Sequence, residues 1–339
     1  MSRLGLFFTL LVVTASAVAQ SSVLAPVSRT PIIGADGRAY GVMFPTACDE
    51  QGRAYVKLLW GEPENVEPLL RISDKGVVEV QFDMSREMPL RYATRPDGGV
   101  VMFHSDEHGR FLDSFASDGK RESSMRLEPT PTPFFPSQLA VFQSGEVFIA
   151  GQQIKPSYKA SAAIYNPSGA LIKQLTFEED VKREQEIVND SGAQRMNARA
   201  VNESVATSGD DGLVYLMRPT NPILIYAISR AGEVVRTLHV TAPAGAGDPR
   251  FGLRVVNNRL MIQYRRDCGP DAKACVGSVF AIVDTDSGKS LAVYEANTKD
   301  VAGTVTCYVP DPDRFFLLSH ALGREGWEIV EARAKDGSQ

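Results

Sequence analysis

Short apolar runs separated by turn-forming residues recur along almost the whole chain. In the clearest copies an apolar stretch ends in a glycine turn and a second apolar stretch follows, as in AAIYNPSGALIKQLTF and LIYAISRAGEVVRTLHV. Runs rich in β-branched and aromatic residues and bounded by such turns predict β-strands. The turn glycines recur at intervals of about 50 residues, which is typical of a repeat architecture. They are Gly76, Gly119, Gly169, Gly232, Gly288 and Gly337.

Each repeat also has an upstream half, in which a turn cluster leads into a second apolar run, as in SGDDGLVYLM. The two halves together predict four strands per repeat, A to D, with tight A–B and C–D turns. Asn257-Asn258 takes the place of glycine in the fifth A–B turn, because asparagine tolerates a positive φ. Strand B is apolar at nearly every position, as expected for a strand buried on both faces. Four-stranded sheets repeated around an axis form a β-propeller.

Six copies predict an all-β fold with a single domain over residues 20–339. The sixth copy has no outer strand of its own, and we expect residues 22–33 to supply it beside residues 327–333. That pairing would close the ring and remove open sheet edges. Four, five or seven blades remain alternatives, because irregular copies are easily miscounted. The predicted blades are residues 42–83, 88–128, 136–177, 196–240, 250–296 and 302–335 with 22–33.

The whole mature chain resembles six-bladed propellers of the broad NHL/TolB-like kind. The resemblance rests on copies such as SGEVFIAG…AAIYNPSGALIKQL and DDGLVYLM…LIYAISRAGEVVRTL. WD40 propellers are less similar, since their Gly-His and Trp-Asp motifs are absent. The resemblance implies the fold and identifies no ligand or reaction.

The N-terminus has the features of a secretory signal peptide. Arg3 precedes an apolar run, and Ala17-Val18-Ala19 forms a small-x-small cleavage site. We expect residues 1–19 to be removed and the protein to be exported, to the periplasm or beyond the cell. A membrane anchor is the alternative, but the apolar stretch is shorter than the roughly 20 residues that span a bilayer. No membrane span is expected after cleavage.

The four cysteines suit an oxidising compartment, and they allow three disulfide connectivities. Cys268 and Cys275 flank a short loop, whereas Cys48 and Cys307 lie at equivalent places in the first and last repeats. We therefore favour Cys268–Cys275 with Cys48–Cys307. Two buried free thiols at Cys48 and Cys307 are the alternative. A metal site would need tighter clustering with histidine.

Charged residues at the exits of the B strands are the candidate ligand-binding residues. If the exits converge, these residues would form a mainly cationic rim for an anionic ligand, such as a carboxylate or an acidic glycan. Ordinary surface ion pairing is the alternative. The formal net charge of −5 gives no reason to expect nucleic acid. The candidate residues are Lys57, His104, Arg218, Arg265, Arg266 and His320.

No catalytic residues can be assigned, and no cofactor or metal is expected. His104-Ser-Asp-Glu-His108 is not the zincin motif, because serine follows the first histidine. The aspartate-rich segments at residues 210–212 and 284–288 lack the distal glutamate of an EF-hand and are interpreted as turns. The chain also contains no G-x-S-x-G elbow. An enzyme is therefore the less favoured class.

The B–C and D–A connections are long, whereas the A–B and C–D turns are tight. Both long connection types leave the same face of a propeller, and variable loops on a rigid scaffold are where binding usually occurs. The largest insertion, residues 178–195, could form a lid over the channel or remain a solvated loop. We predict an exported, monomeric module that binds a protein, peptide or glycan. The alternative is a hydrolase or lyase with a channel-centred, metal-assisted site.

Overall fold

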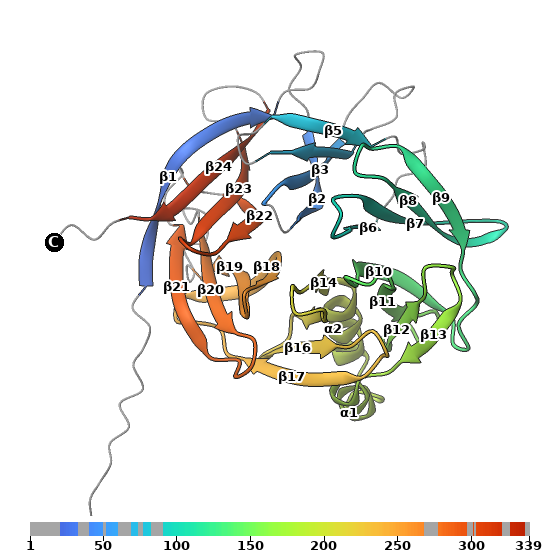
Figure 1. The fold of residues 1–339 in the computed structure, drawn as a ribbon. Helices are drawn as coiled ribbons and strands as arrows, with labels where there is room; N and C mark the ends of the chain where they lie inside the picture. The colour runs from blue at the N-terminus through green and yellow to red at the C-terminus, as the bar shows by residue number, and fades with distance from the viewer. Residues whose placement is uncertain are drawn as a thin grey trace, which may run out of the picture.

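The strands of this computed structural model form sheets arranged around a common centre (Figure 1). The structure describes residues 21–32, 41–49, 52–59, 69–73, 77–82, 91–267, 277–296, 301, 303–320 and 326–335. The predicted signal peptide (1–19) and the predicted Cys268–Cys275 disulfide lie outside these residues. Within them, no helix is long and apolar enough to cross a membrane.

Four of the sheets each contain four antiparallel strands that follow one another in chain order. The first sheet has β2 (Gly41–Cys48), β3 (Ala54–Leu59), β4 (Leu69–Ile72) and β5 (Val78–Phe82). The second has β6 (Arg91–Thr94), β7 (Val100–Asp106), β8 (Gly109–Phe115) and β9 (Arg121–Arg126). The third has β10 (Phe134–Val141), β11 (Val147–Gln153), β12 (Ala160–Tyr165) and β13 (Leu171–Leu175). The fourth has β14 (Val205–Ser208), β15 (Val214–Arg218), β16 (Ile223–Ile228) and β17 (Val234–Val240).

The remaining strands form one sheet of eight, in the order β18-β19-β20-β21-β1-β24-β23-β22. One half comprises β18 (Ala246–Val256), β19 (Arg259–Arg266), β20 (Ser278–Asp284) and β21 (Ser290–Ala296). The other half comprises β22 (Thr304–Val309), β23 (Arg314–His320), β24 (Trp327–Ala334) and β1 (Ser21–Ile32). The fold is therefore an all-β propeller arrangement of four four-stranded sheets and one eight-stranded sheet.

Strand β1 closes the last group of strands, as the sequence predicts. Its residues Leu24–Ile32 pair antiparallel with β24, from Ala334 back to Trp327. The repeats predict six separate sheets, but in the structure the last two groups of four strands share one sheet. They are joined because Ser21–Val23 also pair in parallel with β21. The pairing of β1 with β24 ends at Ala334, so the first residues of β1 reach the neighbouring outer strand and join the two groups.

Two of the predicted glycine turns approach the backbone of the neighbouring sheet closely. Gly119 adopts a φ of +88°, and a Cβ atom there would lie 2.3 Å from the carbonyl oxygen of Gln81 in β5. Gly169 repeats this relationship, with a φ of +86° and a Cβ position 2.3 Å from the carbonyl oxygen of Arg126. Glycine is required at both turns because of its positive φ and because of the close approach to the backbone. Asn257 also has a positive φ, as predicted.

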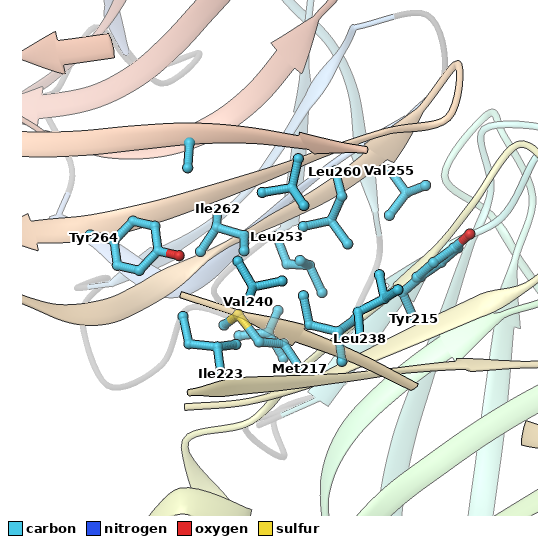
Figure 2. Packing of buried hydrophobic residues seen from close by; sticks show 14 of the residues in the cluster. Tyr215, Met217, Ile223, Leu238, Val240, Leu253, Val255, Leu260, Ile262 and Tyr264 are labelled. Carbon is cyan, nitrogen blue, oxygen red and sulfur yellow. The ribbon is translucent and has the colours of Figure 1, made fainter. Parts of the chain in front are cut away.

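The core consists of apolar layers between neighbouring sheets. Strand β15 is buried along its full length, and its alternate residues face opposite neighbours. Tyr215 and Met217 pack against residues of β18 and β19, such as Leu253 and Ile262 (Figure 2). Leu216 instead belongs to the cluster shared with the third sheet. Burial on both faces explains why the B strands are apolar without alternation.

Residues 178–202 fold into two helices between β13 and β14, so the solvated-loop alternative is wrong. Helix α1 spans Glu178–Glu186 and helix α2 spans Ser191–Asn202. The carboxylate of Asp190 accepts hydrogen bonds from the backbone N–H groups of Gly192 and Ala193, which caps α2. Helix α2 packs beside β10 and β11.

Candidate functional site

Long connections gather at one end of the sheets and tight turns at the other. The prediction that every B–C connection is long is wrong for the second sheet, where only residues 107–108 separate β7 from β8. Since successive strands in each sheet are antiparallel, the A–B and C–D turns lie at one end and the B–C and D–A connections at the other. We call these ends the tight-turn face and the long-connection face. The α1–α2 insertion joins the outer strand β13 to the inner strand β14, so it belongs to the long-connection face.

A cavity of about 100 Å³ with both polar and apolar lining lies between the innermost strands of the ring. Residues of β2, β6, β10, β14, β18 and β22 line it, and these strands surround the centre in Figure 1. Met261 of β19 also lines it, but none of the six candidate residues does. Its polar side chains include those of Arg91, Thr94, Ser137, Thr207, Arg254 and Thr306.

Arg254 connects three groups of strands at the centre of the ring. It stands on β18, and its guanidinium donates to the carbonyl oxygens of Cys48 at 2.8 Å and Asp49 at 2.6 Å. Its Nε also donates to the carbonyl oxygen of Tyr308 on β22 at 3.2 Å. The Cys48–Cys307 disulfide, predicted from the sequence, joins the same two inner strands with Cα atoms 5.2 Å apart. Arg254 therefore supports the closure of the ring.

Arg218 does not contact solvent, contrary to the rim expected at the strand exits. Its side chain is fully buried, and its Nη2 lies 3.0 Å from the Oδ2 of Asp180 on α1. Its Nη1 donates to the hydroxyl of Ser204 at 2.8 Å, and its guanidinium lies over the ring of Phe177. Arg218 thus ties the helical insertion to β15. Its role in the structure is to pair with a buried carboxylate.

Two further polar groups complete the anchor of α1. The hydroxyl of Tyr226 donates to Asp180 at 3.2 Å, and burial together with the charge of Asp180 raises the pKa of Tyr226. Glu184, one turn along α1, accepts a hydrogen bond from the backbone N–H of Ala160 at 2.7 Å. Burial raises the pKa of the Glu184 carboxyl. The insertion is therefore attached by buried polar contacts to two different sheets.

A cleft of about 220 Å³ opens between α2 and the eight-stranded sheet on the long-connection face. One wall is a single stripe of α2 that continues into its C-cap residue Glu203, since these residues are spaced i, i+3, i+4 and i+7. The opposite wall comes from the end of β15, the start of β18 and the end of β19. We call this the α2 cleft; it is lined by Met196, Arg199, Ala200, Glu203, Pro219, Asp248, Pro249 and Arg265.

Arg265 is the candidate residue that the structure places in this cleft. It is exposed at the end of β19 and has no hydrogen-bond or ion-pair partner among the described residues. Arg199 is different, because its Nε donates to Glu203 at 2.7 Å. That hydrogen bond, together with the charge of Asp248, raises the pKa of Arg199.

Lys57 and His104 stand on β3 and β7, in two different sheets. Lys57 is buried on β3. The Nδ1 of His104 lies 3.3 Å from the Oδ2 of Asp113, and its ring stacks on Phe111. The same carboxylate of Asp113 accepts a hydrogen bond from Arg121 at 2.6 Å. His104 therefore belongs to a local cluster within the second sheet.

Arg266 and His320 each have a local partner. Arg266 forms an ion pair with Glu295 on β21 at 3.2 Å. The exposed ring of His320 packs on Trp327, with ring centroids 4.0 Å apart. The six candidate residues thus occupy five strands and separate environments, and the structure does not gather them at one rim.

The other motifs form turns and hairpins. His104 lies within β7, whereas His108 lies in the turn between β7 and β8 and is exposed beside Glu107. Across the described residues, no three histidine, cysteine, aspartate or glutamate side chains are grouped so as to hold a metal ion. Asp211 accepts from the backbone N–H of Leu213, and Asp284 accepts from that of Ser287. These aspartates stabilise turns, as the sequence indicates.

Known proteins resemble this chain in fold, but the comparison identifies no family for it. No family model and no curated protein matches the chain. A solved structure named "Putative exported protein" from Bacteroides fragilis aligns with a TM-score of 0.56 at 10% identity, covering 95% of this chain and 98% of its own. A protein of unknown function from Dyadobacter fermentans aligns with a TM-score of 0.53 at 10% identity, covering 92% and 99%. At this identity the likeness concerns the fold alone.

Proposed function

We propose that this protein is an exported β-propeller that binds a protein or peptide partner through its long-connection face. Export is supported by the predicted signal peptide and by the Cys48–Cys307 disulfide, since disulfides persist in oxidising compartments. The likeness to a protein named as a putative exported protein agrees with this.

We further propose a monomer whose residues 20–339 form one domain with six blades. The two halves of the eight-stranded sheet each contain four antiparallel strands, like the four separate sheets. In this interpretation β1 is the outer strand of the sixth blade, and its short parallel pairing with β21 connects blades five and six.

The observation that carries the binding proposal is the rigid attachment of α1 and α2 on one face. Buried contacts of Arg218 and Glu184 hold the insertion, while the outer side chains of both helices remain exposed. A surface that is ordered before binding loses less conformational entropy when a partner docks. The tight turns of the opposite face present shorter segments.

Matched charge reversals on the two faces test this proposal. One variant carries Lys155→Glu, Lys182→Glu and Arg199→Glu on the long-connection face. Its control carries Lys120→Glu, Arg230→Glu and Lys289→Glu on the tight-turn face. All six side chains are exposed, and both variants change the net charge equally.

The measurement is quantitative mass spectrometry of the proteins that each immobilised variant captures from an envelope extract. We expect the control to retain the wild-type partner and the long-connection variant to lose it. Retention by both variants, or loss by the control alone, would overturn the proposed face.

A further inference from the structure

The cavity at the centre of the ring is lined by two cations and, among the described residues, by no carboxylate. The cations are Arg91 on β6 and Arg254 on β18. The protein as a whole is acidic, with a formal net charge of −5. Two guanidinium groups between packed sheets attract an anion more strongly than they would in bulk water. The central cavity therefore differs from the α2 cleft, where two arginines accompany two carboxylates.

The two cations stand toward opposite ends of the cavity. The innermost strands all run from the long-connection face to the tight-turn face, because each follows a D–A connection and precedes an A–B turn. Arg91 is the first residue of β6, whereas Arg254 lies two residues before the end of β18. Arg91 is therefore nearer the long-connection face and Arg254 nearer the tight-turn face. An anion in the cavity would lie between them.

The hydrogen bonds described above for Arg254 do not neutralise its charge. All three acceptors are backbone carbonyl oxygens, which carry no formal charge. The carboxylate of Asp49 is compensated separately, because the Nε of Arg53 donates to it at 2.6 Å. Burial lowers the pKa of Arg91, as expected for a cation removed from water. A bound anion would offset this effect.

The cavity also offers a hydroxyl donor. The side chain of Thr94, at the end of β6, has no hydrogen-bond partner among the described residues. The hydroxyls of Ser208 and Thr306 are different, because they donate to backbone carbonyl oxygens at 2.5 Å and 2.9 Å. Thr94 is therefore the hydroxyl that is available to a ligand.

The size of the cavity restricts the ligand to a small molecule. A water molecule needs roughly 10–15 Å³ of such volume, so about 100 Å³ accommodates several waters or one small anion. Sites for drug-sized ligands measure about 300–1,000 Å³. The cavity is therefore too small for a peptide or a nucleotide.

A second cavity of about 40 Å³ lies beside the first, toward the tight-turn face. It extends to the turn residues Arg95 and Asp210, and its lining contains two arginines and two aspartates. Charge is balanced there, so the excess of cations is confined to the central cavity. The lining residues common to both cavities are Cys48, Thr94, Thr207, Ser208 and Arg254.

We propose that the central cavity binds a small oxyanion, either an organic carboxylate or inorganic phosphate. The anion lies between Arg91 and Arg254, and Thr94 supplies a hydroxyl donor. Guanidinium groups suit both anions, because their N–H groups match carboxylate and phosphate oxygens. The inference concerns the centre of the ring and does not depend on the proposed partner of the long-connection face.

The test uses the mature chain and trifluoroacetate, a small carboxylate that is followed by ¹⁹F NMR. We expect the protein to broaden the trifluoroacetate signal, and acetate to reverse the broadening. Acetamide has a similar shape but no charge, so it should not compete. Ionic strength is held constant, since screening weakens exposed charges. Phosphate is titrated in the same way, and the stronger competitor of acetate and phosphate identifies the preferred anion.

Variants then assign the binding to the cavity. Arg91→Gln should weaken trifluoroacetate binding by about tenfold or more, and Thr94→Val by about threefold to tenfold. Arg91→Lys should retain most of the affinity, because the charge remains. The control Arg230→Gln removes an exposed cation and should bind like the wild type. Thermal unfolding of each variant verifies that it folds.

Three results would overturn the inference: no broadening with the wild type, equal competition by acetate and acetamide, or wild-type affinity in Arg91→Gln. If Arg91→Gln does not fold, Thr94→Val decides in its place, and wild-type affinity in that variant counts against the site. None of these results bears on the partner captured by the long-connection face, so the two proposals fail separately.

Discussion

The guanidinium of Arg218 lies 3.0 Å from the carboxylate of Asp180, and neither side chain reaches the solvent. Their residues are 38 positions apart in the chain, on β15 and on α1. This pair fixes the helical insertion on the long-connection face and therefore positions the wall of the α2 cleft.

Breaking this pair should destabilise the protein strongly. Arg218→Met leaves the buried carboxylate of Asp180 with only Arg183 as a counter-charge among the described residues, and the Nη1 of Arg183 lies 4.0 Å from it. The loss of one partner of a buried pair costs about 3–5 kcal/mol. The double variant Arg218→Met, Asp180→Leu should be less destabilised than Arg218→Met alone, because no isolated charge remains. Urea denaturation monitored by fluorescence measures both. A loss below about 1 kcal/mol in Arg218→Met would contradict the buried pair.

The stability should also depend on the protonation of Glu184. Burial raises its pKa in the folded state, whereas a glutamate in the unfolded chain titrates near pH 4.3. Above that pH the unfolded state releases its proton first, so the folded state loses stability as the pH rises through the raised pKa.

Glu184→Gln removes this dependence and keeps an oxygen that can accept from the backbone N–H of Ala160. The stability difference is the unfolding free energy of Glu184→Gln minus that of the wild type. This difference should increase as the pH rises from about 4, and it should level off above the raised pKa of Glu184. Denaturation series at several pH values measure this difference. A difference that does not vary with pH would show that Glu184 ionises normally in the folded protein.

Removal of the Cys48–Cys307 disulfide should weaken the closure of the ring. The bond joins residues separated by 259 positions, and removing a native disulfide typically costs about 2–5 kcal/mol. The double variant Cys48→Ala, Cys307→Ala should unfold at a lower temperature in differential scanning calorimetry. An unchanged melting temperature would mean that Arg254 and β1 close the ring without it.

Strand β1 should contribute through its buried anchors. Leu24 is 2% exposed and packs among the aromatic residues of the last sheet, whereas Val27 on the same strand is 55% exposed. Leu24→Ala should cost about 2–5 kcal/mol, and the control Val27→Ala about 0.5 kcal/mol or less. Equal effects in equilibrium denaturation would contradict the observed position of β1.

Several parts of this fold can be predicted from the sequence because they rest on local chemistry. Positive-φ turns select glycine or asparagine, and strands buried on both faces are uniformly apolar, so the turns and B strands are recognisable. The partner of β1 can be predicted because the last repeat lacks a strand. The parallel pairing of Ser21–Val23 with β21 cannot be predicted from the sequence, since it depends on how far β1 extends in space.

The candidate site was harder to predict. The sequence indicates that Arg218 ends a strand, but not that α1 covers it. Arg254 has no local feature that reveals its three carbonyl partners, which come from distant strands. A stronger signal was present in α2, where Met196, Arg199 and Ala200 share one helical face. That spacing indicates a surface stripe once residues 191–202 are interpreted as a helix.

The most direct test of the account is hydrogen–deuterium exchange of the protein with and without its captured partner. The account predicts slower exchange on binding in residues 191–202, at the start of β18 and at the end of β19, which together form the α2 cleft. Slower exchange confined to the tight turns at residues 95–99, 142–146 and 209–213 would contradict it.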